Sequence, residues 1–149
     1  MISPKKKTAA ARAKRATVKV APHIDLSKLI PGDKLPGGTF AGLVYEGRKV
    51  YALILGPEHD GELSWDGANK WAKSVTVDGQ SDFTLMSRPA ASIAFANRKK
   101  EFKPAWYWLG EQHASTSGSA WRQGFNNGDQ NYWNKGNRIR ARAVRRLAI

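Results

Sequence analysis

The chain contains no cysteine, only two methionines and only three histidines among its 149 residues. Without cysteine it has no disulfide framework, no thiolate metal site and no cysteine nucleophile. His23, His59 and His113 are far apart and lack the spacing of a metal site, and no Gly-rich segment has the form of a phosphate-binding loop. These absences argue against an enzyme. We therefore expect a non-enzymatic protein with no catalytic residue, no metal and no other cofactor.

Long apolar runs and acidic residues are also scarce. No stretch approaches the ~18 apolar residues that span a membrane, and no apolar segment of a secretory signal follows the basic N-terminus, so we expect no membrane insertion. There are 12 Asp and Glu against 25 Lys and Arg, which gives a formal net charge of +13 and a pI near 10.3. Such a surface attracts nucleic acid, anionic membrane or an acidic protein face.

Tryptophan and glycine are abundant, with six Trp and fourteen Gly. Together with 41% hydrophobic residues, they favour one compact domain rich in turns and irregular loops over a helical bundle. Composition divides the chain into three parts. We expect a basic N-terminal arm at residues 1–20, a connector rich in Pro and Gly at 21–36, and the globular domain at 37–149.

The arm carries seven basic residues and no acidic residue. By itself it has too little apolar surface to offset the entropy lost on ordering. One interpretation is a solubilising tail, and the other is an arm that docks on nucleic acid or on another protein. The candidate contact residues are Lys5, Lys6, Lys7, Arg12, Lys14, Arg15 and Lys19.

Two strands and two helices are predicted in the first part of the domain. Residues 39–45 and 49–55 are rich in β-branched and aromatic side chains around a short Gly-containing turn, which predicts a hairpin. Residues 56–61 are expected to form an exposed loop, in which His59 is a turn residue and not a metal ligand. Residues 62–73 are predicted to be helical, with Ser64 as N-cap.

Beyond a polar loop with an Asp78-Gly79 turn, residues 84–86 are expected to form a brief strand. Ser87 then caps a second helix, whose Pro89 is tolerated in the first turn.

The C-terminal third is predicted to contain four strands, at residues 105–109, 120–125, 131–134 and 138–147. Residues 110–119 form a polar loop, and Asn127-Gly128 is a strong hairpin signal. In the last strand, alternation places Arg138, Arg140 and Arg142 on one face and small apolar residues on the other. A bulky side chain, expected to be Trp, packs against the small ones.

This region also carries a series of motifs that resembles a known family. The series runs through Tyr107-Trp108, a polar loop from Gly110, Ala120-Trp121, Phe125-Asn126-Asn127-Gly128, Lys135 and Arg140 to Arg146. Its order and spacing resemble a bacterial and phage family of unknown function, akin to the C-terminal domain of the Lcl collagen-like adhesin. Residues 37–42 and the Trp65 and Trp71 pair also fit, so the resemblance covers 37–149.

The resemblance implies an α+β, C-type-lectin-like fold, with two helices packed on small antiparallel sheets and much irregular loop. The family is also similar to the variable ligand-binding domains that diversity-generating retroelements mutate, in which a fixed scaffold carries variable polar positions. Members lie in phage and prophage genomes near structural genes. The resemblance thus implies a virion component, made in the bacterial host cytoplasm, that recognises the host or decorates the particle. We also expect a homo-oligomer that contacts other virion proteins through the arm.

Two positions depart from the family pattern. Leu109 follows the Tyr-Trp pair where Ser is common, and Leu lacks the hydroxyl's hydrogen bonds. The second helix begins Ser87-Arg88-Pro89 where Pro-Thr-Arg is usual.

Calcium-dependent sugar binding is not expected. Calcium needs several carboxylate oxygens, and the C-terminal region that carries the motifs offers only Glu111 and Asp129.

Direct recognition of a protein or glycan surface is therefore the expected function. Trp108 and Trp121 are expected in the core, whereas Trp133 lies among polar residues, a composition typical of binding loops. The candidate ligand-binding residues are Glu111, His113, Ser115, Thr116, Ser117, Ser119, Arg122, Asn126, Asp129, Asn131, Tyr132, Trp133, Asn134 and Asn137.

A nucleic-acid-binding or capsid-cementing protein is the alternative. The arm and the arginines at positions 138, 140, 142, 145 and 146 would then form one basic stripe. Against it, arginines of the last strand also suit structural pairing and stacking on Trp.

Overall fold

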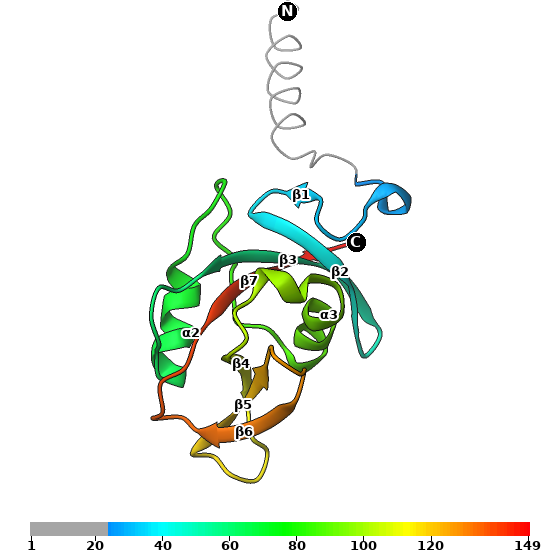
Figure 1. Cartoon of the computed structure of the whole chain (residues 1–149). Helices are drawn as coiled ribbons and strands as arrows, with labels where there is room; N and C mark the ends of the chain where they lie inside the picture. The colour runs from blue at the N-terminus through cyan, green and yellow to red at the C-terminus, as the bar shows by residue number, and fades with distance from the viewer. Residues whose placement is uncertain (1–23) are drawn as a thin grey trace, which may run out of the picture.

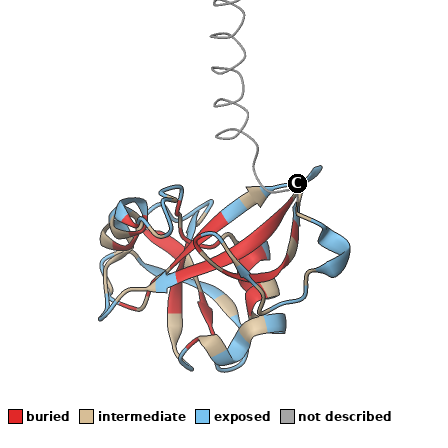
Figure 2. Cartoon of the chain, turned by 90° about the horizontal axis from the view of Figure 1, so that it is seen from above, coloured by how far each residue is buried: buried red, intermediate tan, exposed pale blue. Residues whose placement is uncertain are grey.

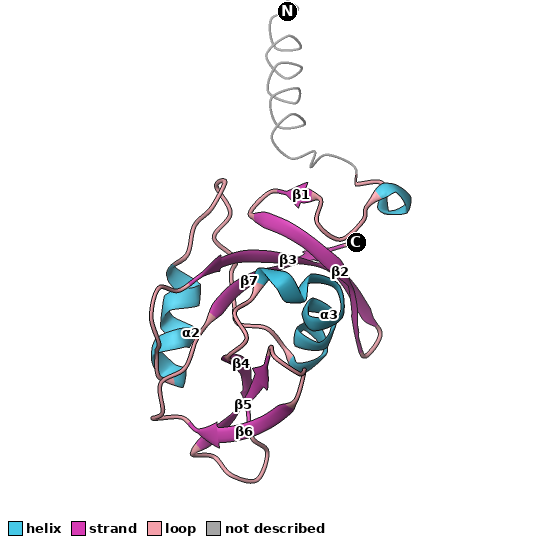
Figure 3. Ribbon diagram, viewed as in Figure 1, coloured by secondary structure: helices cyan, strands magenta, loops and turns pink. Residues whose placement is uncertain are grey.

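The computed structural model describes residues 24–149 and shows an α+β architecture with two helices and two antiparallel sheets (Figure 1, Figure 3). This confirms the predicted α+β class with two helices and antiparallel sheets. The predicted basic arm, with its seven contact residues, lies outside the described residues. In the view of Figure 1 one sheet lies above the other, and the two helices lie on either side between them.

The first sheet has four strands in the order β1-β2-β3-β7. The hairpin predicted around Gly47 is confirmed as strands β2 and β3. β1 pairs with the outer edge of β2, and β7 pairs with the outer edge of β3. β7 comes from the far end of the chain and pairs antiparallel with β3, with Val144 opposite Leu55. The bounds are β1 (Lys34–Leu35), β2 (Gly38–Glu46), β3 (Lys49–Glu58) and β7 (Arg142–Ala148).

The second sheet has three strands in the order β4-β5-β6. They are β4 (Trp106–Gln112), β5 (Ser119–Gly124) and β6 (Gln130–Asn134). The sheet is tied to the segment that leads into β7, because the Trp108 amide donates to the Arg140 carbonyl at 3.0 Å. β6 is the edge strand, and four of its five residues are exposed.

Both helices begin directly after the serine that was predicted to cap them. α2 (Trp65–Ser74) is capped by Ser64, whose hydroxyl accepts from the Gly67 amide. α3 (Arg88–Arg98) is capped by Ser87, whose hydroxyl accepts from the Ala90 amide. Short 3-10 turns, η1 (Leu26–Lys28) and η2 (Lys99–Glu101), lie in the connector and after α3.

The core consists of two groups of buried side chains. One lies between α3 and the four-stranded sheet and contains Tyr107, Leu109 and Phe125. The other lies beside α2 and contains Trp108, Phe83 and Ile139. Figure 2 shows that the buried residues follow the strands through the middle of the molecule. Leu109, which replaces the Ser common in the family that the sequence resembles, is fully buried, so this position supports the core.

Several predicted boundaries are wrong. Gly56 to Glu58 belong to β3 and not to a loop, because Glu58 pairs with Arg142 across the sheet. Residues 110–112 extend β4 through a bulge and are not loop. Residues 84–86 form no strand, and only Thr84 makes a bridge, to Val144.

The start of α2 and the start of β7 also differ from the prediction, and isolated β-bridges explain both differences. Leu63 pairs with Ile139, so α2 begins at Trp65 and not at residue 62. The same bridge, and one between Tyr107 and Arg140, hold the segment before β7, so that this strand begins at Arg142. Such contacts join residues more than thirty positions apart and leave no local signal in the sequence.

The predicted alternation near the last strand is confirmed. Ile139, Ala141 and Ala143 are buried, and Trp108 belongs to the same core group, as expected for a bulky partner. The pattern ends there, because Val144 and Arg145 are both buried.

Candidate functional site

The three-stranded sheet carries most of the predicted ligand-binding residues. Cross-strand pairing sets Trp121 opposite Tyr132 and Arg122 opposite Asn131. Because neighbouring residues in a strand point to opposite faces, the two pairs lie on different faces of the sheet. The predicted residues are thus divided between two surfaces.

On one face, the Arg122 guanidinium lies between two tryptophan rings. Its carbon is 3.9 Å from the ring centre of Trp106 and 4.1 Å from that of Trp133. The Arg122 Nε donates to Asn131 Oδ1 at 2.8 Å, and burial lowers the pKa of Arg122 from its ordinary value. Stacking and hydrogen bonding fix the guanidinium. Trp133 therefore has a fixed inner face, while 39% of its surface is exposed.

On the other face, Tyr132 lies against His113. The two ring centres are 3.9 Å apart, and 48% of the Tyr132 surface is exposed. The His113 Nδ1 accepts from the amides of Thr116 at 3.1 Å and Ser115 at 3.4 Å. A neutral His113 then carries its proton on Nε2. The loop after β4 is thus folded onto the histidine that supports Tyr132.

Arg88 belongs to this surface but carries no sequence signal for it. Its guanidinium carbon is 3.5 Å from the ring centre of Trp121, and its Nε donates to Gln130 Oε1 at 3.0 Å. Gln130 also donates to the buried Gln123, which itself donates to the Ala91 carbonyl. These contacts join α3 to the sheet. A shallow cavity of about 380 Å³ lies beside them, lined by Arg88, Pro89, Ser92, Glu111 and Gln130.

The remaining predicted residues lie in loops at the two ends of the sheet. Ser115, Thr116 and Ser117 are exposed, whereas Ser119 is only 9% exposed and contributes little to any contact surface.

Asn126 and Asp129 are exposed in the turn between β5 and β6, where the Asp129 amide donates to Asn127. Asn134 and Asn137 occupy the turn after β6, where Asn134 accepts from the Gly136 and Asn137 amides. In these turns the Asn127 and Asn134 side chains accept from turn amides, so they shape the backbone.

The arginines near β7 do not form one exposed basic stripe. Arg145 is only 5% exposed and donates to Asp82 Oδ1 at 2.6 Å and to the Pro36 carbonyl. Arg140 pairs with Glu58 at 3.3 Å, and Arg142 donates to two backbone carbonyls. The expected structural pairing is present. The observed stacking partner of Arg142 is Phe102, not Trp.

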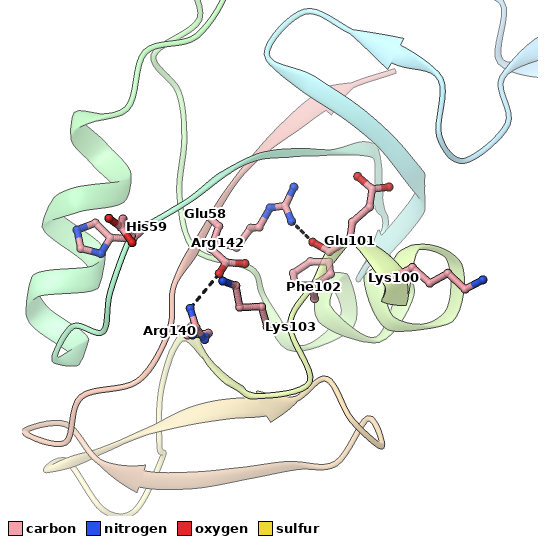
Figure 4. Close-up of a pocket in the computed structure, with 9 residues that line it drawn as sticks. Glu58, His59, Lys100, Glu101, Phe102, Lys103, Arg140 and Arg142 are labelled. Carbon is pink, nitrogen blue, oxygen red and sulfur yellow. Dashed lines mark hydrogen bonds and ion pairs between the residues drawn. The ribbon is translucent and has the colours of Figure 1, made fainter.

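A second cavity, of about 470 Å³, lies between the end of β3, η2 and the start of β7. Figure 4 shows Glu58 near its centre, with Arg140, Arg142 and Lys103 around it. The Glu58 carboxylate also accepts from the Tyr107 hydroxyl at 2.5 Å. No sequence motif identified the lining residues, because they come from three separate segments, 58–60, 100–103 and 140–142. The cavity is lined by Glu58, His59, Asp60, Lys100, Glu101, Phe102, Lys103, Arg140 and Arg142.

Among residues 24–149, no three His, Cys, Asp or Glu side chains are grouped closely enough to hold a metal ion. No helix in the same range has both the length and the apolar character needed to cross a membrane.

Comparison with known proteins does not assign the chain to a family. No family model matches the chain, and no curated protein matches it.

Proposed function

We propose that the chain is a non-enzymatic binding module whose edge strand β6 presents Tyr132 and Trp133, one on each face of the sheet, to a protein or glycan of another surface. The observation that carries the proposal is the exposure of both rings on the edge strand β6. Large exposed aromatic side chains with a polar rim are typical of interaction sites. Asn131, Asn134 and the exposed serines of the loop after β4 supply that rim.

The support behind the two rings strengthens the proposal. Trp133 rests on Arg122, and Tyr132 rests on His113. Aromatic contacts that are already fixed lose little conformational entropy on binding.

The proposed scaffold is C-type-lectin-like, and the proposed setting is a phage or prophage virion. The α+β class, the two antiparallel sheets and the motif series of residues 37–149 support the scaffold. On this view, the sheet β4-β5-β6 faces the ligand and the basic N-terminal arm contacts other virion proteins. Host recognition and particle decoration are the two roles that fit such a module.

The binding proposal is tested with one double variant and one single variant as its control. Tyr132→Ser with Trp133→Ser removes both exposed rings, whereas Tyr45→Ser removes a ring that is 69% exposed on β2 of the other sheet. We expect the labelled double variant to bind intact bacteria, or an immobilised glycan panel, at least about tenfold more weakly, as at other aromatic hot spots. Tyr45→Ser is expected to bind like the wild type. Equal binding by all three proteins would refute the proposed surface.

The setting is tested separately by mass spectrometry of purified particles. Peptides of this chain at constant stoichiometry through repeated density gradients support a virion component. Loss of these peptides during purification would contradict the virion setting but would leave the proposed binding surface unaffected.

A second candidate function is nucleic-acid binding through the arm. It is supported by the charge, since residues 1–20 carry seven Lys and Arg and no Asp or Glu. Affinity for random duplex DNA would then fall steeply with salt, and deletion of residues 1–20 would abolish it. No measurable binding at ~50 mM salt would rule this candidate out.

A further inference from the structure

We propose that the cavity around Glu58 is a binding site for an oxyanion, either the carboxylate of an acidic sugar or a phosphate. The cavity is separate from the aromatic surface of β6 and does not depend on the proposed function. It holds about 470 Å³, a volume in the range of small-molecule sites.

The first support is the balance of charge inside the cavity. Glu58 lies at the centre, but its two oxygens are already occupied by the Tyr107 hydroxyl and Arg140. Glu101 also lines the cavity, yet its carboxylate pairs with Arg98. In Figure 4 the dashed line from Arg142 ends on the Glu101 backbone carbonyl and not on its carboxylate. Asp60 also lines the cavity, and Glu58 and Glu101 act on Arg142 through space. Both glutamates, however, form their ion pairs with other arginines, Glu58 with Arg140 and Glu101 with Arg98.

Arg142 and Lys103 are cations of the cavity that take no part in these ion pairs. Arg142 is tied by Nε to the Gly56 carbonyl at 2.7 Å and by Nη1 to the Glu101 carbonyl at 2.5 Å. Both partners are neutral, and among residues 24–149 no carboxylate forms an ion pair with Arg142 or Lys103. Glu58 and Glu101 therefore act on Arg142 only through space, and an oxyanion in the cavity would be its first directly hydrogen-bonded anionic partner.

The second support is the fixed position of these groups. Arg142 is stacked on the Phe102 ring at 4.9 Å, and the backbone amide of Lys103 donates to the Tyr107 hydroxyl at 2.9 Å. Figure 4 shows the Lys103 side chain directed toward Glu58 and Arg140, whereas Lys100 points out of the cavity. Donors from β7, the segment before it and the loop after η2 therefore converge before any ligand arrives. Convergent Arg and Lys donors are the usual means of holding carboxylate and phosphate.

The test is an amide NMR titration of the full chain with two probes, inorganic phosphate and D-glucuronate, at constant ionic strength. Lys103→Gln removes a charge directed toward Glu58, and Lys100→Gln removes the same charge from a lining residue of the same segment whose side chain is directed away from Glu58. We expect Lys103→Gln to raise the Kd of the bound probe about tenfold, and Lys100→Gln to change it less than about twofold, because only Lys103 is directed inward.

A third variant tests the sign of the electrostatics. Glu58→Gln keeps an acceptor for Tyr107 and removes the negative charge, so we expect anion affinity to rise several-fold. Thermal melting of each variant checks that it is folded. If Glu58→Gln fails to fold, the two lysine variants still decide the result.

The two probes identify the source of the oxyanion. Binding of glucuronate alone indicates an acidic sugar, binding of phosphate alone indicates a phosphorylated ligand, and binding of both indicates a general oxyanion site. The proposal is overturned if the amides of Phe102 and Tyr107 show no saturable shift with either probe. An equal rise in Kd for Lys100→Gln and Lys103→Gln would also overturn the proposal. That result would show that the anion responds to the overall positive charge and not to a site at Lys103.

Discussion

At the scale of single residues, two buried tyrosines each donate a hydrogen bond from the hydroxyl group to a glutamate. The Tyr107 hydroxyl donates to Glu58, and the Tyr51 hydroxyl donates to Glu46, which also accepts from Ser87. Burial, reinforced by the hydrogen bond to Glu46, raises the pKa of Tyr51 to about 12. Burial and the hydrogen bond to Glu58 likewise raise the pKa of Tyr107. Both phenols are held in their neutral form.

A pH dependence of stability follows from Tyr51. The unfolded phenol has a pKa of about 10, so the folded state binds the proton more tightly, and this contribution is complete below pH 10. We expect the free energy of unfolding to fall, on the order of 2 kcal/mol from this group, as pH rises from about 10 to 12. Chemical unfolding at several pH values measures it.

Two phenylalanine variants identify the group responsible. Tyr51→Phe should flatten the loss between pH 10 and 12, although Tyr107 still contributes in the same direction. Tyr45→Phe, at an exposed position on β2, should leave the slope unchanged. An identical slope in Tyr51→Phe and wild type would contradict the assignment.

At the scale of elements, helix starts were predictable and strand ends were not. Ser64 and Ser87 each lie directly before a helix, and their hydroxyls bond to amides within the first turn, so the signal is local. The extension of β3 to Glu58 depends instead on Arg142, which lies far along the chain. The same difference explains the site. Tyr132 and Trp133 were found from composition, whereas Arg88 was missed because it reaches Trp121 only through the packing of α3.

The cap of α2 gives a test at this scale. Ser64→Ala removes the acceptor of the Gly67 amide and should lower the free energy of unfolding by about 1 kcal/mol. Ser64→Asp keeps an acceptor and places a negative charge at the helix N-terminus, so it should retain most of the stability. Urea unfolding of both variants checks this. A loss as large in Ser64→Asp as in Ser64→Ala would show that the cap is not the cause.

At the scale of the whole molecule, Arg145 joins parts of the chain that are far apart. From β7 it donates to Asp82 in the loop before α3 and to the Pro36 carbonyl beside β1. Its side chain is 7% exposed, while that of Asp82 is 56% exposed. The arginine thus connects the last strand, the first strand and the central loop, and its hydrogen bond lowers the pKa of Asp82.

Replacement of this arginine should weaken the entire fold. Arg145→Met keeps much of the buried volume but leaves the Pro36 carbonyl without its donor, and we expect a loss of about 1–3 kcal/mol in the free energy of unfolding. The neighbouring Arg146 is exposed, so Arg146→Met should change stability by no more than about 0.5 kcal/mol. Thermal and urea unfolding of the pair measure the difference. Equal losses would contradict a special role for Arg145.

The sequence by itself determined the features that depend on neighbours along the chain. These are the β2-β3 hairpin, the two serine caps, the Asp78-Gly79 turn, in which both residues have positive φ, and the alternation of Ile139, Ala141 and Ala143. Their physical causes, turn geometry, capping and side-chain period, act within a few residues. The exposed aromatic pair of β6 also followed from composition.

Only the tertiary structure decided which charges meet and which faces are covered. Packing set Arg122 between Trp106 and Trp133, buried Arg145, and gathered Glu58, Lys103, Arg140 and Arg142 around one cavity. Side chains from separate segments approach each other only after the sheets and helices have packed. A one-dimensional pattern of basic residues therefore does not distinguish an arginine that supports the fold from a lysine directed into a cavity.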